Sequence, residues 1–182
     1  MAQIPKPEYH GGGWIPLEVW PVEKRPAALW PWLEEAGSLT EKLRSAAKAD
    51  FHVRVLQQAQ APLDAGDAGL LQVPAGTNAH IRQVYLCARL PWVYARTLAL
   101  TGDRHWLEQL GTQPLGERVF AAADTQRGPI EVAQLYPRHE LYGASVNDLD
   151  RKPPMLWARR SVLIVDGSRL LIYECFLPGM DV

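Results

Sequence analysis

The sequence predicts an α+β domain: one antiparallel β-sheet of about six strands with helices packed on one side of it. Apolar runs with strand-like alternation recur along the chain, and most consecutive runs are separated by short turn-like segments. Two short segments with helix-start signals interrupt these runs. Because strands joined by hairpins pair antiparallel, the few helices must cover the sheet rather than alternate with its strands.

The length, charge and hydropathy of the chain argue against several classes of protein. The 182 residues suit a single domain spanning residues 1–182, and they are enough to bury a sizeable core. With 19 basic and 20 acidic residues, the net charge of -1 gives no electrostatic footprint for nucleic acid or an anionic membrane. The chain has no apolar run of membrane-spanning length, and its start lacks the apolar core of a secretory signal. We therefore expect a cytoplasmic monomer with no nucleic-acid partner and no membrane span.

No metal or cofactor is expected. Cys87 and Cys175 lie inside apolar strand-like runs, which favours small buried side chains over a disulfide, with a catalytic cysteine as the alternative. The glycine-rich nucleotide and phosphate motifs and the nucleophile-elbow motif are absent. The histidines lack the close spacing of a zinc site; they are His10, His52, His80, His105 and His139.

The N-terminal quarter contains an extension and then a helix. Residues 1–28 are rich in Pro, Gly and Trp, so we expect them to lie over the domain without regular helix, with tryptophans as anchors. Those tryptophans are Trp14, Trp20, Trp30 and Trp32. Ser38 and Glu41 have capping-box spacing ahead of a helix that runs to about Lys48. Its first turn leaves free N–H groups at Leu39 and Thr40, which either water or an anion can satisfy.

The remaining elements follow in order. The pattern predicts strands at 51–55, 80–88, 92–100 and 130–135, and a final hairpin of 160–165 and 169–177 around Asp166-Gly167. It predicts helices at 105–110, capped by Asp103, and from Pro114 to about Ala122, with a free N–H at Leu115. Residues 59–78 read as turns, and 137–155 as an irregular surface excursion.

Charges in phase with apolar residues mark two of these strands. Glu174 alternates with Leu170, Ile172 and Phe176, so all four share one face of the last strand. Arg82 is likewise in phase with apolar neighbours in the first hairpin. An ionised carboxylate is almost never fully buried alone, so Glu174 needs either a cation or a cavity with polar groups.

Two interpretations of these charges stand side by side. In the structural interpretation, Arg82 and Glu174 either form a buried ion pair within the sheet or lie on solvent-exposed faces of edge strands. Alternatively they line a small-molecule pocket together with the helix-start amides of Leu39 and Leu115. A guanidinium and free amides both favour a carboxylate, so such a pocket suits an aromatic or cyclic carboxylic acid.

Six segments carry more specific patterns in order along the chain: GSLTEKLR (37–44), RQVYLC (82–87), PWVYARTL (91–98), LGTQPLGERVF (110–120), LWARRSVL (156–163) and LLIYECFLP (170–178). Together they resemble the chorismate pyruvate-lyase family, from about residue 30 to the end. Residues 137–155 look longer than the corresponding segment in the shorter family members. Position 39 is Leu where some relatives have Met, which matters little for a main-chain contact.

The resemblance implies a fold, a reaction and a site. The family fold is an antiparallel sheet with helices packed on it, and its product is held away from solvent, which implies slow release. The reaction removes pyruvate from chorismate to give 4-hydroxybenzoate, the first step of ubiquinone synthesis, without a cofactor. The residues implied are Arg82 and Glu174 as catalytic side chains, with Leu39 and Leu115 binding substrate through the main chain.

Several other residues keep alternative interpretations. Arg96, Arg159 and Arg160 are weaker candidates for contacting a second carboxylate, while Arg96 is equally suited to pairing with Glu108, Glu117 or Glu131. Tyr85 and Tyr94 are pocket walls or, by default, aromatic core.

A ligand sensor is the alternative function. The effector-binding domains of GntR-type regulators have a similar fold and bind small molecules without converting them. Those domains normally follow a DNA-binding helix-turn-helix, for which the first 35 residues here are too short and too rich in proline. The sequence therefore favours the lyase.

Overall fold

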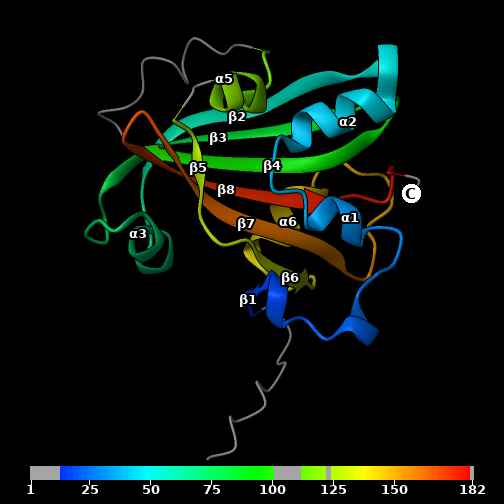
Figure 1. The fold of residues 1–182 in the computed structure, drawn as a ribbon, viewed down its shortest axis with the longest axis horizontal. Coiled ribbons are helices and arrows are strands. Elements are labelled where there is room, and N and C mark those ends of the chain that lie inside the picture. The colour runs from blue at the N-terminus through cyan, green and yellow to red at the C-terminus, as the bar shows by residue number, and fades with distance from the viewer. Residues whose placement is uncertain (1–12, 101–111, 122–123, 181–182) are drawn as a thin grey trace, which may run out of the picture.

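The computed structural model describes residues 13–100, 112–121 and 124–180 (Figure 1). Its strands form one antiparallel sheet in the order β1-β6-β7-β8-β4-β3-β2, and β5 pairs with β7 beside this path. The sheet has 8 strands instead of about six. The two additional strands, β1 and β5, have 2 residues each, too few for alternation to show in the sequence. The helix predicted at 105–110 lies outside the described residues.

The elements have the following bounds. The strands are β1 (Ile15–Pro16), β2 (His52–Pro62), β3 (Asn78–Cys87), β4 (Pro91–Leu100), β5 (Gln126–Arg127), β6 (Glu131–Leu135), β7 (Leu156–Val165) and β8 (Ser168–Phe176). The helices are α1 (Trp30–Leu33), α2 (Leu39–Ala47), α3 (Ala65–Leu71), α5 (Leu115–Ala121) and α6 (Glu140–Val146). Short 3-10 turns lie at Leu17–Val19, Val22–Lys24 and Lys48–Asp50.

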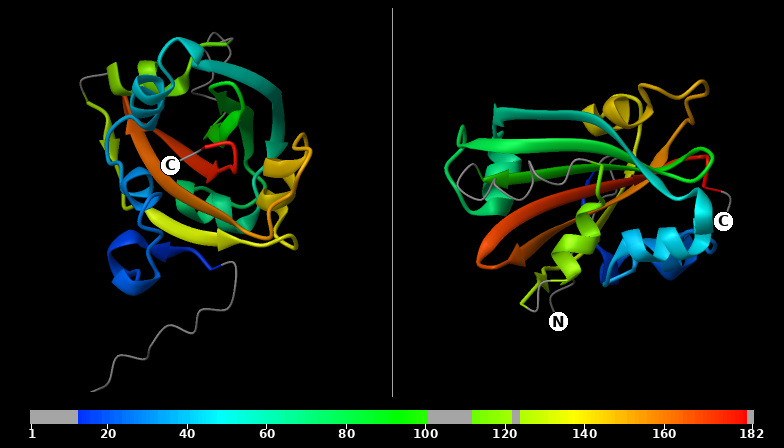
Figure 2. Two further views of the ribbon diagram at one scale, coloured as in Figure 1. Left: turned by 90° about the vertical axis from the view of Figure 1, so that its right-hand side faces the viewer. Right: turned by 90° about the horizontal axis from the view of Figure 1, so that it is seen from above.

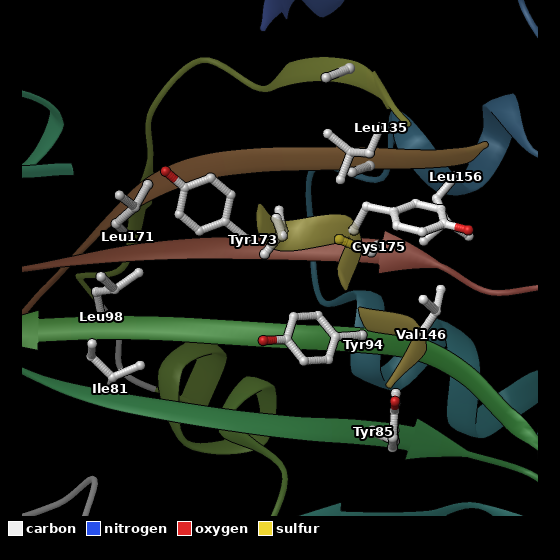
Figure 3. Packing of buried hydrophobic residues seen from close by; sticks show 14 of the residues in the cluster. Ile81, Tyr85, Tyr94, Leu98, Leu135, Val146, Leu156, Leu171, Tyr173 and Cys175 are labelled. Carbon is white, nitrogen blue, oxygen red and sulfur yellow. The ribbon is translucent and has the colours of Figure 1, made fainter. Parts of the chain in front are cut away.

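Helices cover both faces of the curved sheet, so the prediction of helices on one side is wrong (Figure 2). On one face, α3 and α6 pack against an aromatic and aliphatic core that includes Tyr85, Tyr94 and Cys175 (Figure 3). On the other face, residues of α1 and α2 pack against β3, β4 and β8, and α5 packs beside them. Strand alternation gives both faces apolar residues, and each face therefore needs its own cover.

Residues 59–78 contain regular structure that the sequence analysis did not predict. Strand β2 continues to Pro62, and α3 follows after Leu63. Asp64 caps this helix, with its Oδ1 accepting a hydrogen bond of 2.7 Å from the Asp67 amide. β2 is the strand at one edge of the sheet, and many of its side chains are exposed to solvent. Because these exposed side chains are polar, the sequence of β2 does not look like that of a core strand.

The segment 137–155 is also not a simple surface excursion. It contains α6, which begins after His139; the Nδ1 of His139 accepts a hydrogen bond from the Leu141 amide at 3.1 Å. Leu141, Tyr142 and Val146 are buried against the core. One helix of 7 residues offers less than two full turns of periodicity, which explains why the pattern was missed.

Several local predictions are confirmed. Asp166 and Gly167 both have positive φ, 50° and 80°, as a two-residue hairpin turn requires. Ser38 caps α2 by accepting a hydrogen bond from the Glu41 amide at 3.2 Å. Trp20 and Trp30 are buried, so the described part of the N-terminal extension is anchored to the domain. None of the helices in the described residues is both long and apolar enough to cross a membrane.

The two cysteines are buried and free, as expected from their apolar surroundings. Burial raises the pKa of Cys175 to about 12 and also raises the pKa of Cys87. Neither thiol is therefore ionised at neutral pH, which argues against a nucleophilic cysteine. Tyr85 and Tyr94 belong to the core on the α3 and α6 face, which decides between the two interpretations in favour of core.

Candidate functional site

A cavity lies on the sheet face that α2 and α5 cover. Its floor comes from β3, β4 and β8, and the first residues of both helices lie above it. All four residues predicted from the sequence, Leu39, Arg82, Leu115 and Glu174, line this cavity. The other lining residues are Thr40, Val53, Val84, Leu86, Ala95, Thr97, Pro114, Gly116, Val119, Arg127, Leu163 and Ile172.

The strand register explains why Arg82 and Glu174 face the same space. Arg82 pairs with Thr97, Thr97 with Ile172, and Ile172 with Ser161, so these four residues form one row across β3, β4, β8 and β7. In the next row on the same face, two residues along each strand, Glu174 lies between Ala95 on β4 and Arg159 on β7. Residues in register point to the same face of an antiparallel sheet. The in-phase charges of the sequence therefore meet over one floor.

Arg82 is buried, with 2% of its surface exposed. The Nη2 of Arg82 donates to the main-chain carbonyl of Gln113 at 3.3 Å, and Gln113 lies just before the start of α5. Desolvation lowers the pKa of Arg82 from its usual value, although a guanidinium remains a cation at any physiological pH. This fixed, buried positive charge suits a ligand carboxylate.

Glu174 pairs with Arg159, its neighbour in register. Arg159 Nε donates to Glu174 Oε2 at 2.6 Å, and 1% of the Arg159 side chain is exposed. Its Nη1 also donates to three main-chain carbonyls, at 3.2, 3.2 and 2.7 Å; they belong to Trp32, Leu33 and Glu35. The buried ion pair considered from the sequence therefore exists, but its cation is Arg159 and not Arg82. Arg159 makes these contacts through Nε and Nη1, and it does not line the cavity.

Arg127 is a cavity residue that the sequence analysis missed. Its Nη1 donates to Ser161 Oγ at 2.5 Å, its Nε to Ala36 O at 3.0 Å and its Nη2 to Gly37 O at 3.2 Å. Burial lowers the pKa of Arg127, whereas the negative charge of Glu174 raises it. β5 has only 2 residues, so no alternation pattern pointed to this arginine.

The first turns of α2 and α5 touch each other above the cavity. A methyl group added at Gly116 would lie 2.6 Å from Thr40 Oγ1 and 2.9 Å from Ser38 Oγ, both inside van der Waals contact. Arg44 of α2 also pairs with Glu117 of α5. Gly116 thus permits the two helix starts to meet, and it places the main chain of Leu39 and Leu115 at one site.

The other two arginine candidates lie in a different pocket. Arg96 pairs with Glu140 at 3.4 Å and Arg160 pairs with Glu131 at 2.7 Å. Both line a pocket with Tyr173 and residues of α3 and α6, and neither lines the cavity. The partner of Arg96 is therefore Glu140, which was not among the partners considered; of those, Glu108 lies outside the described residues.

The side chains that line the cavity suit an anionic ring compound by their charge and polarity. Arg82 and Arg127 supply cations, Glu174 supplies a hydrogen-bond acceptor, and apolar residues supply the remaining wall. In the part of the chain that the structure describes, no group of three or more metal-binding side chains comes together. A buried arginine and a fixed carboxylate around one cavity suit catalysis by positioning and electrostatics.

Comparisons with known proteins show which family this sequence resembles. Residues 18–180 match the chorismate lyase family. A probable chorismate pyruvate-lyase of Halorhodospira halophila is 42% identical over 163 residues, covering 86% of each chain. A second one, of Thiobacillus denitrificans, is 36% identical over 177 residues, covering 92% of this chain and 90% of the relative.

Solved structures with a similar fold come from transcriptional regulators. The effector domain of PhnF from Mycobacterium smegmatis has a TM-score of 0.57 and 12% identity, covering 80% of this chain and 91% of that domain. A GntR-family regulator from Bacillus cereus has a TM-score of 0.56 and 11% identity, covering 74% and 96%. At these identities the likeness concerns the fold alone, whereas the family match and the sequence relatives extend over most of the chain. The chain belongs to the chorismate lyase family.

Proposed function

We propose that this protein removes pyruvate from chorismate and releases 4-hydroxybenzoate. The observation that carries the proposal is that Arg82 and Glu174, implied by the family resemblance, line one cavity beneath the first turns of α2 and α5. The curated relatives are named probable chorismate pyruvate-lyases, which supports the same reaction. We further propose that the protein acts as a cytoplasmic monomer at the first step of ubiquinone synthesis.

The proposed roles follow from the residue types. Arg82, helped by the main-chain amides of Leu39 and Leu115, holds the ring carboxylate. Glu174 accepts a hydrogen bond from the ring hydroxyl, and Arg159 fixes the direction of that carboxylate. The bond between the ring and the enolpyruvyl oxygen breaks, and the carbon bearing the hydroxyl loses its hydrogen as a proton. The oxygen leaves with the enolpyruvyl group, whose methylene carbon takes up one proton to give pyruvate. The ring becomes aromatic, no electrons enter or leave, and positioning of the substrate supplies the main acceleration.

The test follows both products in one reaction. Purified, chelator-treated protein is mixed with chorismate, and pyruvate and 4-hydroxybenzoate are measured together. Equimolar formation of both, lost in Arg82→Met and Glu174→Gln, supports the proposal. Glu131→Gln is the matched control, because Glu131 pairs with an arginine outside the cavity.

Two results would contradict the proposal. If chorismate stays intact while 4-hydroxybenzoate binds, the protein is a binding module, as the regulator domains of similar fold are. If neither molecule interacts with the protein, Arg82 and Glu174 are structural charges only.

A further inference from the structure

The floor of the cavity consists of two rows of three residues. β3, β4 and β8 lie side by side in the sheet, in this order (Figure 1). Their register gives a first row of Arg82, Thr97 and Ile172, and a second row of Val84, Ala95 and Glu174. The two rows are two residues apart along each strand, so all six side chains point to the same face. All six line the cavity.

The two charged residues occupy opposite corners of this floor. Arg82 lies on β3 in the first row, and Glu174 lies on β8 in the second row. Two strand spacings of about 4.8 Å and one step of two residues separate them, roughly 12 Å between their backbones. The line from Arg82 to Glu174 therefore crosses β4 between Thr97 and Ala95. A ligand that contacts both charged side chains lies over β4.

The two sides of this line differ in polarity. Val84 and Ala95 make one side apolar, whereas Thr97 brings a hydroxyl to the other side, next to Ile172. Thr97 is buried, with 4% of its surface exposed. A buried hydroxyl favours a hydrogen-bond partner. The Thr97 side of the floor therefore suits a ligand oxygen, and the other side suits carbon and hydrogen.

We propose that Thr97 binds the ether oxygen of the substrate. This inference rests on the proposed function, in which Arg82 holds the ring carboxylate and Glu174 contacts the hydroxyl at the opposite ring carbon. Chorismate carries its enolpyruvyl ether beside that hydroxyl, on one side of the axis through these two groups. The Thr97 hydroxyl donates a hydrogen bond to the ether oxygen. The ring edge without substituents then faces Val84 and Ala95.

This contact acts on the bond that breaks. As the ether oxygen leaves the ring, negative charge develops on it, and a hydroxyl that donates to it stabilises the transition state. The hydroxyl keeps its proton, so Thr97 changes the rate without changing the balance of the reaction. The same contact selects the side of the cavity on which the leaving group lies.

Two unreactive ligands of similar shape test this inference. 3,4-Dihydroxybenzoate has an oxygen at the ring position of the ether, and 4-hydroxy-3-methylbenzoate has a methyl group there. Isothermal calorimetry gives the ratio of their affinities. Thr97→Val replaces the hydroxyl by a methyl group, and it should weaken binding of the dihydroxy ligand relative to the methyl ligand about fivefold, the contribution of one hydrogen bond. Thr97→Ser should keep the wild-type ratio.

The same substitution at two other threonines provides the comparison. Thr77→Val is the matched control, because Thr77 does not line the cavity and its hydroxyl donates to the Pro74 carbonyl at 2.7 Å. This variant should keep the wild-type ratio. Thr40 also lines the cavity, but from the first turn of α2 above the floor. Thr40→Val should therefore change the ratio less than Thr97→Val does, and the reverse order would overturn the inference.

The outcomes separate a binding role from a structural one. If Thr97→Val weakens both ligands equally, Thr97 only supports the floor, and the inference is wrong. An unchanged ratio, or a wild-type protein that binds neither ligand, also overturns it. With chorismate, Thr97→Val should lower kcat about fivefold and Thr97→Ser should restore it. Since neither ligand reacts, a ratio that depends on Thr97 supports the inference even if chorismate stays intact, which contradicts only the proposed reaction.

Discussion

Arg159 and Glu174 face each other in register on β7 and β8, and Arg159 Nε donates to Glu174 Oε2 at 2.6 Å. The same guanidinium donates through Nη1 to Trp32 O, Leu33 O and Glu35 O. One buried cation thus joins the cavity carboxylate to the chain segment that precedes α2. The position of Glu174 depends on both the sheet and the N-terminal segment.

Removing Arg159 should destabilise the fold strongly. Arg159→Met leaves the Glu174 carboxylate buried without its cation, and breaking such a pair costs about 3–5 kcal/mol. Urea denaturation gives the free energy of unfolding. Arg89→Met is the control, because Arg89 is largely exposed and its loss should change stability by no more than about 0.5 kcal/mol. A loss for Arg159→Met as small as that of the control would show that the pair contributes little. The double variant Arg159→Met with Glu174→Gln should recover part of the lost stability.

Removing Arg82 should reduce catalysis more than stability. Arg82→Ala removes the cation proposed to hold the ring carboxylate, so kcat/KM for chorismate should fall well over tenfold, about 2–4 kcal/mol of transition-state stabilisation. Steady-state kinetics measures the fall, and thermal unfolding checks the fold. Arg54→Ala, which loses a surface ion pair with Asp148, should keep full activity. Unchanged kinetics of Arg82→Ala would contradict the assigned role.

A methyl group at Gly116 should push α2 and α5 apart. The added carbon would lie 2.6 Å from Thr40 Oγ1, and overpacking of this kind costs about 1–3 kcal/mol. We expect Gly116→Ala to lower both stability and ligand affinity. Gly69→Ala is the matched control, since it lies in α3 with no atom within 4 Å of the added carbon. That change should stabilise the protein by about 0.4–1 kcal/mol. Equal effects of the two changes would argue against close contact of the two helix starts.

The buried Asp67 should make stability fall as pH rises. Burial raises the pKa of Asp67 above its ordinary value of 3.8, although the hydrogen bond from Tyr173 acts in the opposite direction. The native state therefore holds this proton more tightly than the unfolded chain does. The resulting stabilisation is complete below pH 3.8 and is lost as pH rises through the native pKa.

Asp67→Asn cannot titrate and isolates this effect. The stability of the wild type relative to Asp67→Asn should decrease between acidic and neutral pH, as measured by urea unfolding at several pH values. Tyr173→Phe removes the hydrogen bond that lowers the pKa of Asp67, so the decrease should extend to higher pH. A difference that stays constant with pH would show that Asp67 does not titrate differently in the native state.

Product release should limit turnover under the proposed function. The cavity lies beneath the first turns of α2 and α5, and the family resemblance implies that the product is held away from solvent. Rapid-quench measurements should show a burst of product close to one equivalent of enzyme, followed by a slower steady rate. A single rate without a burst would place the limiting step at or before the chemistry.

The sequence by itself determined the local features of this protein. Alternation placed Arg82 and Glu174 on apolar strand faces, the Asp166-Gly167 pair predicted the last hairpin turn, and Ser38 marked the start of α2. These features depend on residues that are neighbours in the chain, and a periodicity or a capping side chain shows in the sequence. The sequence motifs also led to the correct family.

Only the tertiary structure decided which charges meet. Glu174 pairs with Arg159 because β7 and β8 place them in register, and no local pattern distinguishes Arg159 from Arg160 as that partner. Arg127 reaches the cavity from a strand of 2 residues, and its contacts with Ala36 and Gly37 span about half the length of the chain. Such pairings depend on sheet order and on the approach of distant segments, and packing free energy fixes both. Sequence neighbours therefore specified the strands and caps, whereas the ion pair and the second cation of the site required the folded chain.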